Sequence, residues 1–233
     1  MGRVFACSDL HGHWELWDAI KKFLQPDDKM FYLGDATDRG SDGWAILKEM
    51  LNDERIAYIA GNHDILLADR IGNPHSYRIA NLHHSNGGDP TWRDAEDDPE
   101  AQEIKNKIRG LPKYATYTNA DGLKIFMSHS GSTNIESDED LIWDRTCFIT
   151  SKNYTDYDIV VHGHTTIPHL IQDLDEINTF YAIDGKEPIK LEEWEGGAYW
   201  YHGWRCDIDC CTILTKQTVL LDLDTFDEEI FEM

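Results

Sequence analysis

The chain has 233 residues, enough for one large domain or for a domain with an inserted cap. Its formal net charge of −23 argues against a nucleic-acid groove, because so acidic a surface repels phosphate backbones. No apolar run approaches the roughly 20 residues of a spanning helix, and the first residues predict a strand and not a secretory signal. The odd, scattered set of five cysteines is typical of free thiols in a cytoplasmic protein.

Strands and helices alternate over the first sixty residues. Apolar periodicity predicts, in order, strand 3–8, helix 14–24, strand 30–33, helix 42–52 and strand 56–60. We expect Ser41 to cap the second helix. This β-α-β-α-β order favours parallel strands with right-handed crossovers, whose ligands lie at the carboxyl ends of the strands.

The rest of the chain is less regular. Residues 65–111 predict a mostly helical cap beside the site, with the clearest helix at 99–109, where Pro99 suits the first turn. The later strands are predicted at 114–118 and 124–128 as a hairpin, at 159–161, and at 206–212 paired with 218–223. Residues 166–205, rich in Trp, Tyr and Glu, are expected to be irregular and to shape the substrate entrance or simply pack. We expect the acidic tail from Asp224 to fray.

Polar clusters follow the predicted strands. Three of them combine metal-ligand side chains with glycine: Ser-Asp-Leu-His-Gly at 8–12, Gly-Asp-Ala-Thr-Asp-Arg-Gly at 34–40 and Gly-Asn-His-Asp at 61–64. Asp9 and His11 are two residues apart, so both can reach one ion in an extended chain. The Asp35 carboxylate can bridge two cations. Three further ligands, each at the end of a later strand, could complete a second ion: Asn62, His129 and His164. Such mixed oxygen and nitrogen ligation suits manganese, iron or zinc better than calcium.

These clusters fit phosphate ester hydrolysis. Two ions about 3.5–4 Å apart would activate a bridging water and clamp a phosphoryl group for in-line attack. His63 is the best general acid for the leaving group, and Asp38 is the carboxylate that could orient it. Arg39 and Arg145 could each fork onto the phosphate oxygens.

Each cluster taken alone also has a simpler explanation as a loop, a turn or a helix cap. Five such clusters in order, each after a strand, favour the metal site instead. The histidines that lack this support are expected to be structural: His13, His162 and His169. The three histidines of the cap are expected to be polar surface: His75, His83 and His84.

Together these motifs resemble the signature of calcineurin-like metallophosphoesterases. The His-Ser-Gly at 129–131 and the Gly-His-Thr at 163–165 extend the match, and Asp-Arg-Gly at 38–40 is similar to the phosphoprotein phosphatase branch. The likeness is strongest to small bacterial and bacteriophage (lambda-type) serine/threonine protein phosphatases, over about residues 3–165 and 206–224. Three departures are mild: Ser8 stands where Gly is commoner, Asp64 where Glu is, and Ser130 where Ala is.

The resemblance implies an α/β fold (α+β in some schemes) with four layers, in which two packed mixed β-sheets are flanked by helices. It implies one metallophosphoesterase domain over 1–233 with a cap insertion at about 65–111. The implied ligands are Asp9, His11 and Asp35 for one ion and Asp35, Asn62, His129 and His164 for the other. The implied proton-donor pair is His63 with Asp38, and the implied phosphate-binding residues are Arg39, Arg145 and Asn62.

Three functions then compete. The first is a phosphatase with two divalent ions, manganese before iron, zinc or nickel, that acts on phosphoserine and phosphothreonine in proteins, with phosphotyrosine as a further candidate. The second is a hydrolase of diadenosine tetraphosphate, and the third a non-catalytic metal-binding scaffold, which the complete ligand set disfavours. We expect a cytoplasmic monomer whose substrate is a phosphoprotein, a phosphopeptide or a phosphorylated small molecule, without a stable nucleic-acid or membrane partner.

Overall fold

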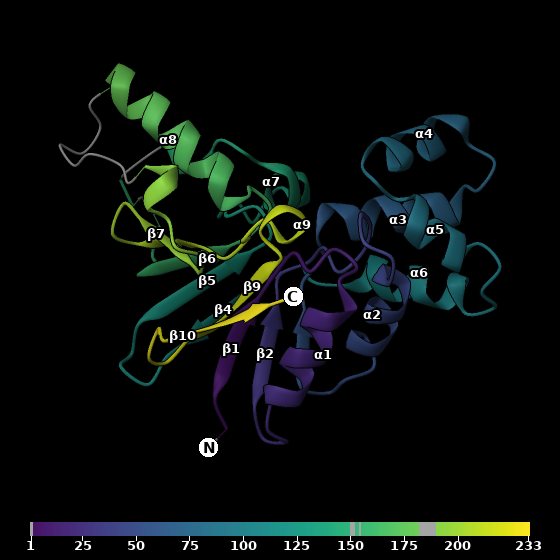
Figure 1. The fold of residues 1–233 in the computed structure, drawn as a ribbon, viewed down its shortest axis with the longest axis horizontal. Helices are drawn as coiled ribbons and strands as arrows, with labels where there is room; N and C mark the ends of the chain where they lie inside the picture. Colours follow the sequence, from purple (N-terminus) through teal and green to yellow (C-terminus); the bar gives the residue numbers. More distant parts are fainter. Residues whose placement is uncertain (1, 150–151, 154, 182–189) are drawn as a thin grey trace.

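Two five-stranded β-sheets face each other, and helices lie on their outer sides (Figure 1). The computed structural model describes residues 2–149, 152–153, 155–181 and 190–233, with the backbone alone for 176–181. Both sheets contain parallel and antiparallel pairs. This arrangement confirms the predicted α/β class with two mixed sheets flanked by helices.

The first sheet has the strand order β10-β9-β1-β2-β3, in which β9 is Gln217–Asp222 and β10 is Glu228–Glu232. Its parallel part and the crossover helices are β1 (Val4–Cys7), α1 (Trp14–Phe23), β2 (Lys29–Tyr32), α2 (Gly43–Met50) and β3 (Ile56–Tyr58). Side chains of β1 alternate between the two faces, so that Phe5 and Cys7 pack towards the helices and Ala6 packs towards the second sheet. The predicted β-α-β-α-β order is therefore confirmed.

The second sheet has the order β4-β5-β6-β8-β7. Its strands are β4 (Tyr114–Thr118), β5 (Lys124–Ser128), β6 (Ile159–His162), β7 (Tyr199–Tyr201) and β8 (Arg205–Asp207). The hairpin of β4 and β5 was predicted with the same bounds. Short helical elements connect the strands: α7 (Asp138–Trp143), the 3₁₀ turns Cys147–Ile149 and Leu191–Glu193, and α9 (Thr212–Thr215).

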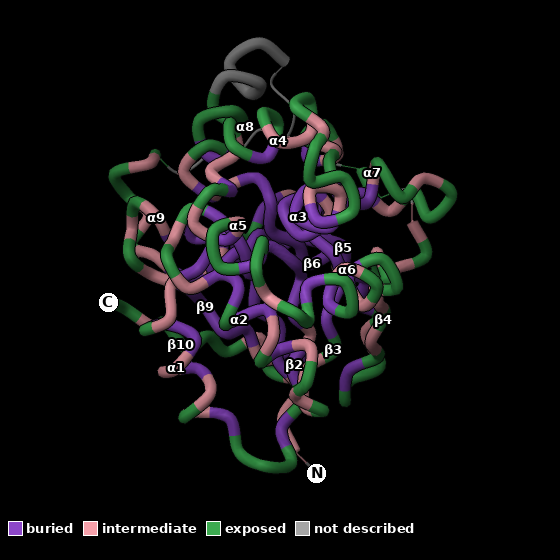
Figure 2. Tube along the Cα trace, turned by 90° about the vertical axis from the view of Figure 1, so that its right-hand side faces the viewer, coloured by how far each residue is buried: buried purple, intermediate pink, exposed green. Residues whose placement is uncertain are grey.

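Two main clusters of buried side chains hold these layers together. One lies between the first sheet and its helices and contains Trp17 and Leu47. The other joins the sheets, with Leu221 of β9 against Met127 of β5 and Val161 of β6. Figure 2 shows buried residues running along the strands, with exposed residues on the outer helices such as α4.

Four helices follow β3 and lie together at one side of the molecule (Figure 1). They are α3 (Asn62–Gly72), α4 (Tyr77–Ser85), α5 (Asp89–Ala95) and α6 (Ala101–Gly110), here called the four-helix segment. The predicted helical character of 65–111 is confirmed. However, α6 begins at Ala101 after the cap residue Glu100, so Pro99 precedes the helix and is not in its first turn.

The structure corrects several predictions for other parts of the chain. Residues 206–212 and 218–223 do not pair, because β8 belongs to the second sheet and β9 (Gln217–Asp222) to the first. The tail is not frayed, since β10 (Glu228–Glu232) pairs antiparallel with β9. A helix, α8 (Ile167–Tyr181), was not predicted. The N-cap of α2 is Asp42 and not Ser41.

Part of the aromatic stretch 166–205 packs against the core. Tyr199, Tyr201 and Trp194 belong to the cluster between the sheets, although residues 182–189 of this stretch lie outside the described part. The five cysteines carry free thiols, four of them buried. Among the residues described, no helix is both long and apolar enough to cross a membrane.

Asp98 fastens the four-helix segment to α2. Its carboxylate accepts hydrogen bonds from Trp44 Nε1 at 2.8 Å and from Lys48 Nζ at 3.0 Å. The bond from Trp44, the backbone N–H of Glu100 and the bond from Lys48 lower the pKa of Asp98 to about 2. The ionised carboxylate therefore stabilises this junction.

We expect Asp98→Asn to lower the free energy of unfolding by about 1 kcal/mol at pH 7, because charge-assisted hydrogen bonds are lost at a partly exposed site. The folded pKa lies below the unfolded value of about 3.9, so this contribution is complete above pH 4. It should disappear as the pH falls towards 2, and denaturant titrations of both proteins across this range would show it. Asp97→Asn, the same change at an exposed neighbour, should have no such effect; a constant difference between wild type and Asp98→Asn at every pH would contradict the prediction.

Candidate metal centre

The predicted ligands converge where strands of both sheets end. Asp9 and Asp35 follow β1 and β2, and Asn62 begins α3 directly after β3. His129 and His164 follow β5 and β6 of the other sheet. Because the two sheets face each other, these strand ends meet at one edge, and all five side chains are buried.

Backbone strain directs several of these side chains. Residues other than glycine rarely adopt a positive φ, and each such residue costs about 1–3 kcal/mol. Six site residues nevertheless do so: Asp9 (54°), His11 (42°), Asp35 (61°), Asp38 (71°), Arg39 (65°) and His164 (68°). Strain concentrated at one place is typical of a functional site.

Asp35 is the centre of the constellation. Its Oδ1 accepts the backbone N–H of His63 at the start of α3, at 3.0 Å. Its Oδ2 faces three imidazoles, at 3.3 Å from His129 Nε2 and 3.9 Å from both His11 Nε2 and His63 Nε2. Two groups of possible metal ligands share this carboxylate: His11, Asp35 and His63, and Asp35, His129 and His164.

Hydrogen bonds from Nδ1 to backbone carbonyls determine which ring nitrogen of two histidines faces the centre. His11 Nδ1–H donates to the Thr37 carbonyl at 2.9 Å, and His129 Nδ1–H donates to the Leu33 carbonyl at 2.7 Å. Each Nε2 is then directed inward and offers its lone pair to the centre once it is unprotonated. His129 Nε2 also lies 2.9 Å from Asn62 Oδ1. Acceptor atoms that converge in this way need a proton or a cation between them.

The electrostatics of the histidines suit metal ligation, because only a neutral imidazole binds an ion. Burial, assisted by the Arg39 charge, keeps the pKa of His11 well below its usual value, and burial with His129 does the same for His164. Within the described part, His164 Nε2 is buried without a hydrogen-bond partner. His129 differs, because Asp35 and Asp9 overcome the effect of burial and raise its pKa to about 9, so a bound ion would have to displace the proton from its Nε2.

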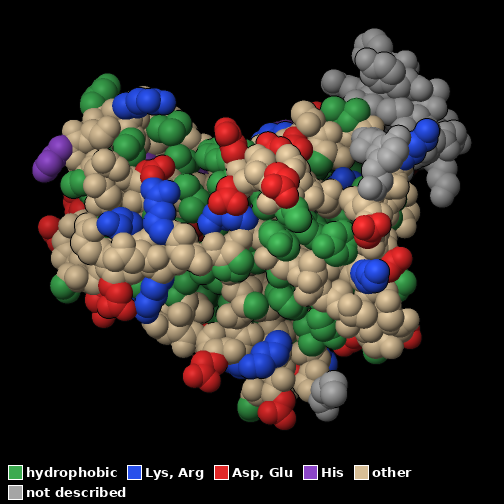
Figure 3. Space-filling view, turned by 180° about the vertical axis from the view of Figure 1, so that it is seen from behind, with side chains coloured by type: hydrophobic (Ala, Val, Ile, Leu, Met, Phe, Trp, Pro, Cys, Tyr) green, Lys and Arg blue, Asp and Glu red, His purple; other side chains and the backbone are tan. Residues whose placement is uncertain are grey.

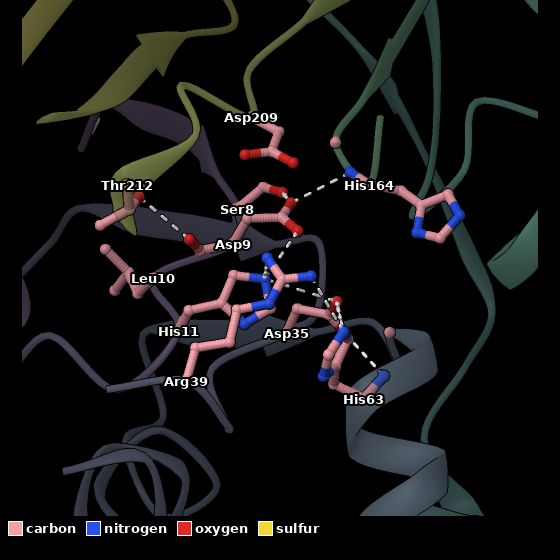
Figure 4. Close-up of polar contacts among 12 residues, drawn as sticks. Ser8, Asp9, Leu10, His11, Asp35, Arg39, His63, His164, Asp209 and Thr212 are labelled. Atoms are coloured by element: carbon pink, nitrogen blue, oxygen red, sulfur yellow. Dashed lines mark hydrogen bonds and ion pairs between the residues drawn. The ribbon is translucent and has the colours of Figure 1, made fainter. Parts of the chain in front are cut away.

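Asp9 accepts three hydrogen bonds, from Ser8, His164 and Thr212 (Figure 4). Its carboxylate accepts from the Ser8 hydroxyl and from the backbone N–H of His164, and its carbonyl accepts from the Thr212 hydroxyl at 3.1 Å. Burial and the Asp35 charge raise the pKa of Asp9 to about 6, although His129 opposes this shift. Asp209, to which the sequence analysis gave no role, lies above Asp9 in Figure 4. Two buried carboxylates of the site thus lie close together, which further favours a cation.

His63 and Asp38 are in contact. His63 Nδ1–H donates to Asp38 Oδ2 at 2.8 Å, and both side chains are almost fully buried. Burial alone would raise the pKa of Asp38, but the bonds from His63 and His83 outweigh it and lower the pKa. The remaining ring nitrogen of His63, Nε2, points back towards Asp35.

His83 is the main error of the sequence analysis, which placed it on the polar surface. The side chain has an exposed fraction of 0%, and its Nε2 lies 3.0 and 3.1 Å from the two oxygens of Asp38. One signal lies in the sequence that follows it, Asn-Gly-Gly at 86–88, because the second glycine leaves room for the ring. A side chain at Gly88 would collide with the His83 ring.

The two predicted arginines differ in position. Arg39 reaches over the centre, with Nη1 2.9 Å from His11 Nε2 and Nη2 3.3 Å from His63 Nε2. Arg145 lies in an exposed loop after α7, where its charge helps to lower the pKa of His164. Arg39 is therefore already inside the constellation, and Arg145 lies at its rim.

Asp64 gains a clear role. Its Oδ2 accepts the backbone N–H groups of Gly61 and Asp35, both at 3.0 Å, and its Oδ1 accepts the Tyr58 hydroxyl at 3.1 Å. The shorter side chain in place of Glu thus caps α3 and fixes the backbone of Asp35, the central carboxylate.

One of the histidines expected to be structural, His162, is hydrogen-bonded at Nε2 to the Tyr201 hydroxyl, 2.6 Å away, and lies outside the constellation.

Comparison with known proteins gives the family. The sequence model of the family described as calcineurin-like phosphoesterase matches residues 2–175, more than half of the chain. No curated protein sequence matches.

Solved structures similar to this chain share its fold at low identity. A putative diadenosine tetraphosphatase has a TM-score of 0.62 at 12% identity, with 99% of this chain and 93% of that chain covered. A protein serine/threonine phosphatase from Saccharomyces cerevisiae, with similarity to human phosphatase PP5, gives 0.59 at 12%, covering 100% and 80%. A cold-active protein-tyrosine phosphatase of a Shewanella species gives 0.52 at 15%, covering 100% and 81%. On the family match, the chain belongs to the calcineurin-like phosphoesterases, hydrolases of phosphoric esters that use divalent metal ions.

Proposed function

We propose that the protein is a phosphomonoesterase that acts on phosphoserine and phosphothreonine in proteins, and also on phosphotyrosine. The observation that carries this proposal is the buried pair of His63 and Asp38 beside the ligand constellation. A bare metal site needs no such pair, whereas the cleavage of a phosphate ester needs a proton for the leaving oxygen. Because Asp38 holds the proton on Nδ1, Nε2 of His63 is the nitrogen that would carry the transferable proton once Arg39 has left it for the phosphate.

The site fits two divalent ions. We propose Asp9, His11 and Asp35 as ligands of one ion, and Asp35, Asn62, His129 and His164 as ligands of the other. The orphaned Nε2 of His164 and the inward lone pairs described above support this assignment. When bound, such ions supply an activated water and neutralise charge on the phosphoryl group, and Mn²⁺ suits the mixed donor set, with iron, zinc or nickel as alternatives.

The other proposed residues orient the phosphate. Arg39 carries two parallel N–H donors that could move from His11 and His63 onto phosphate oxygens, as guanidinium groups commonly do. Asn62 lies at the start of α3, where the helix dipole favours an anion. Arg145 at the rim would bind the phosphate from the opposite side.

A pocket of about 320 Å³ beside the centre fits part of a peptide. Its apolar wall is Ile65, Ile142 and Trp143, and the Trp143 ring also lies edge-on to His164. Basic and acidic side chains share its rim, and Figure 3 shows such charges together near the notch between the four-helix segment and the α8 side. The rim carries Arg109 and Lys113 as well as Asp138 and Glu139, so it can contact peptide residues of either charge near the phosphate.

The four-helix segment is proposed to be the cap insertion of a single domain, and the chain to act as a monomer. The free cysteines support a reducing compartment such as the cytoplasm.

A chelation panel tests the function. The protein is stripped with EDTA and then assayed on a phosphoserine peptide, a phosphotyrosine peptide and diadenosine tetraphosphate, with manganese, zinc, iron, nickel or magnesium added in turn. We expect loss of activity on chelation, recovery best with Mn²⁺, and a preference for the phosphoserine peptide. Mn²⁺ should also raise Tm without substrate, because it binds the folded state. Faster cleavage of the dinucleotide would contradict the substrate class, and no effect of any metal on Tm would contradict the ligand assignment.

His63→Asn should lower kcat on the phosphoserine peptide by roughly 10²–10⁴-fold, as expected for the loss of a general acid. Bound metal, measured by mass spectrometry of the purified protein, should not change. His169→Asn, at an exposed histidine of α8, is the matched control and should retain full activity. Unchanged turnover in His63→Asn would remove this residue from its proposed role.

Asp35→Asn should reduce bound metal below that of the wild type, because the shared ligand loses its charge. Gly61→Ala should also reduce bound metal although no ligand is replaced, because the added Cβ would collide with the Asp35 carboxylate. Overpacking of this kind costs about 1–3 kcal/mol in stability. Gly110→Ala, where a Cβ would meet no atom within 4 Å, is the control. Full metal content in both Asp35→Asn and Gly61→Ala would place the ions elsewhere.

A further inference from the structure

His83 is unusual for its position. It is the only residue described as buried on α4, a helix that otherwise exposes large side chains such as Tyr77 and Leu82. An imidazole buried alone on an exposed helix is costly unless its nitrogen atoms are paired. Both nitrogens of His83 are paired, one with Asp38 and one with Arg70.

These two contacts determine the proton position of His83. Arg70 can only donate, and its Nη1 lies 3.3 Å from His83 Nδ1, so Nδ1 is the acceptor. The N–H that faces Asp38 is then on Nε2, which lies 3.0 Å from Oδ1 and 3.1 Å from Oδ2 of Asp38. Arg70 is itself held over the Trp92 ring, 4.5 Å from its centroid. A fixed chain of donors therefore runs from α3 through α4 to Asp38.

The same four-helix segment also holds the backbone around Asp38. The Asp38 N–H donates to Thr91 Oγ1 at 2.8 Å, and the Arg39 N–H donates to the Gly87 carbonyl at 2.8 Å. Both Asp38 and Arg39 have a positive φ, so this turn needs outside support. The segment thus holds the backbone and the carboxylate of Asp38 separately.

We propose that His83 is a positioning residue for the proton donor, fixing the rotation of the Asp38 carboxylate so that its Oδ2 stays on Nδ1 of His63. The inference rests on the proposed phosphomonoesterase function. A carboxylate bound by one donor can rotate about its terminal bond, whereas two donors from different directions fix its plane. The fixed carboxylate in turn keeps Nε2 of His63 directed at the leaving oxygen. His83 touches neither the substrate nor any proposed metal ligand directly.

The test compares leaving groups. His83→Leu removes the N–H donor, whereas His83→Gln keeps an N–H donor near the position of Nε2. Both are assayed with Mn²⁺ on a phosphoserine peptide, whose alkoxide needs a proton, and on p-nitrophenyl phosphate, whose leaving group does not. His75→Leu, at an exposed histidine of the same segment, is the matched control.

For His83→Leu we expect kcat to fall by about 10–100-fold on the phosphopeptide and only a few-fold on p-nitrophenyl phosphate, with KM and bound metal unchanged. His83→Gln should recover most of the loss, and His75→Leu should match the wild type. Equal losses on both esters would mean a merely structural role and overturn the proposal. No loss at all, or no recovery with Gln, would also overturn it.

A second measurement does not depend on turnover. In the wild type labelled with ¹⁵N-histidine, NMR should show His83 protonated at Nε2, and His83→Leu should shift the Nδ1–H signal of His63. Protonation at Nδ1 of His83, or an unmoved His63 signal, would overturn the proposal. If the wild type cleaved neither ester, the proposed function would fail while these spectra still decided the role of His83.

Discussion

The structure depends on one buried carboxylate that faces several imidazoles. Asp35 follows β2, and its backbone is clamped by the side chain of Asp64. Its two oxygens have different partners. Oδ1 accepts the backbone N–H of His63 in the first turn of α3, and Oδ2 faces the imidazoles of His129, His11 and His63. A carboxylate in this place is stable only with positive charge around it, and the surrounding groups lower its pKa well below the usual range despite burial. The two sheets are therefore joined at this edge by charge as well as by their apolar core.

Local sequence was sufficient for the part of the site that lies at strand ends. Asp9, Asp35 and Asn62 each follow a short apolar run, and parallel topology then brings them to one edge. The same holds for His129 and His164, whose strands were also predicted. The position of these residues at one edge could be anticipated, because an apolar run followed by a ligand beside a glycine is visible in neighbouring residues of the sequence.

What the sequence did not predict depends on distant partners. The burial of His83 comes from Asp38, 45 residues earlier in the chain, and nothing in the pattern of α4 reveals it. The separation of β8 and β9 into different sheets likewise depends on which strand each meets. Helix α8 was missed because its sequence carries Thr, Asn and aromatic residues with weak helical propensity, while packing of Leu170 and Ile171 stabilises it.

The position of β9 has a consequence for folding. β9 pairs antiparallel with β1, with Leu221 opposite Ala6, so the first strand acquires this neighbour only after more than 200 further residues have been made. Until then β1 is an edge strand with an open row of backbone groups, which invites pairing with other chains. Contacts of such high contact order also form slowly. A ribosome-bound or truncated chain without β9 would thus be prone to aggregate, even though every proposed metal ligand is already present in it.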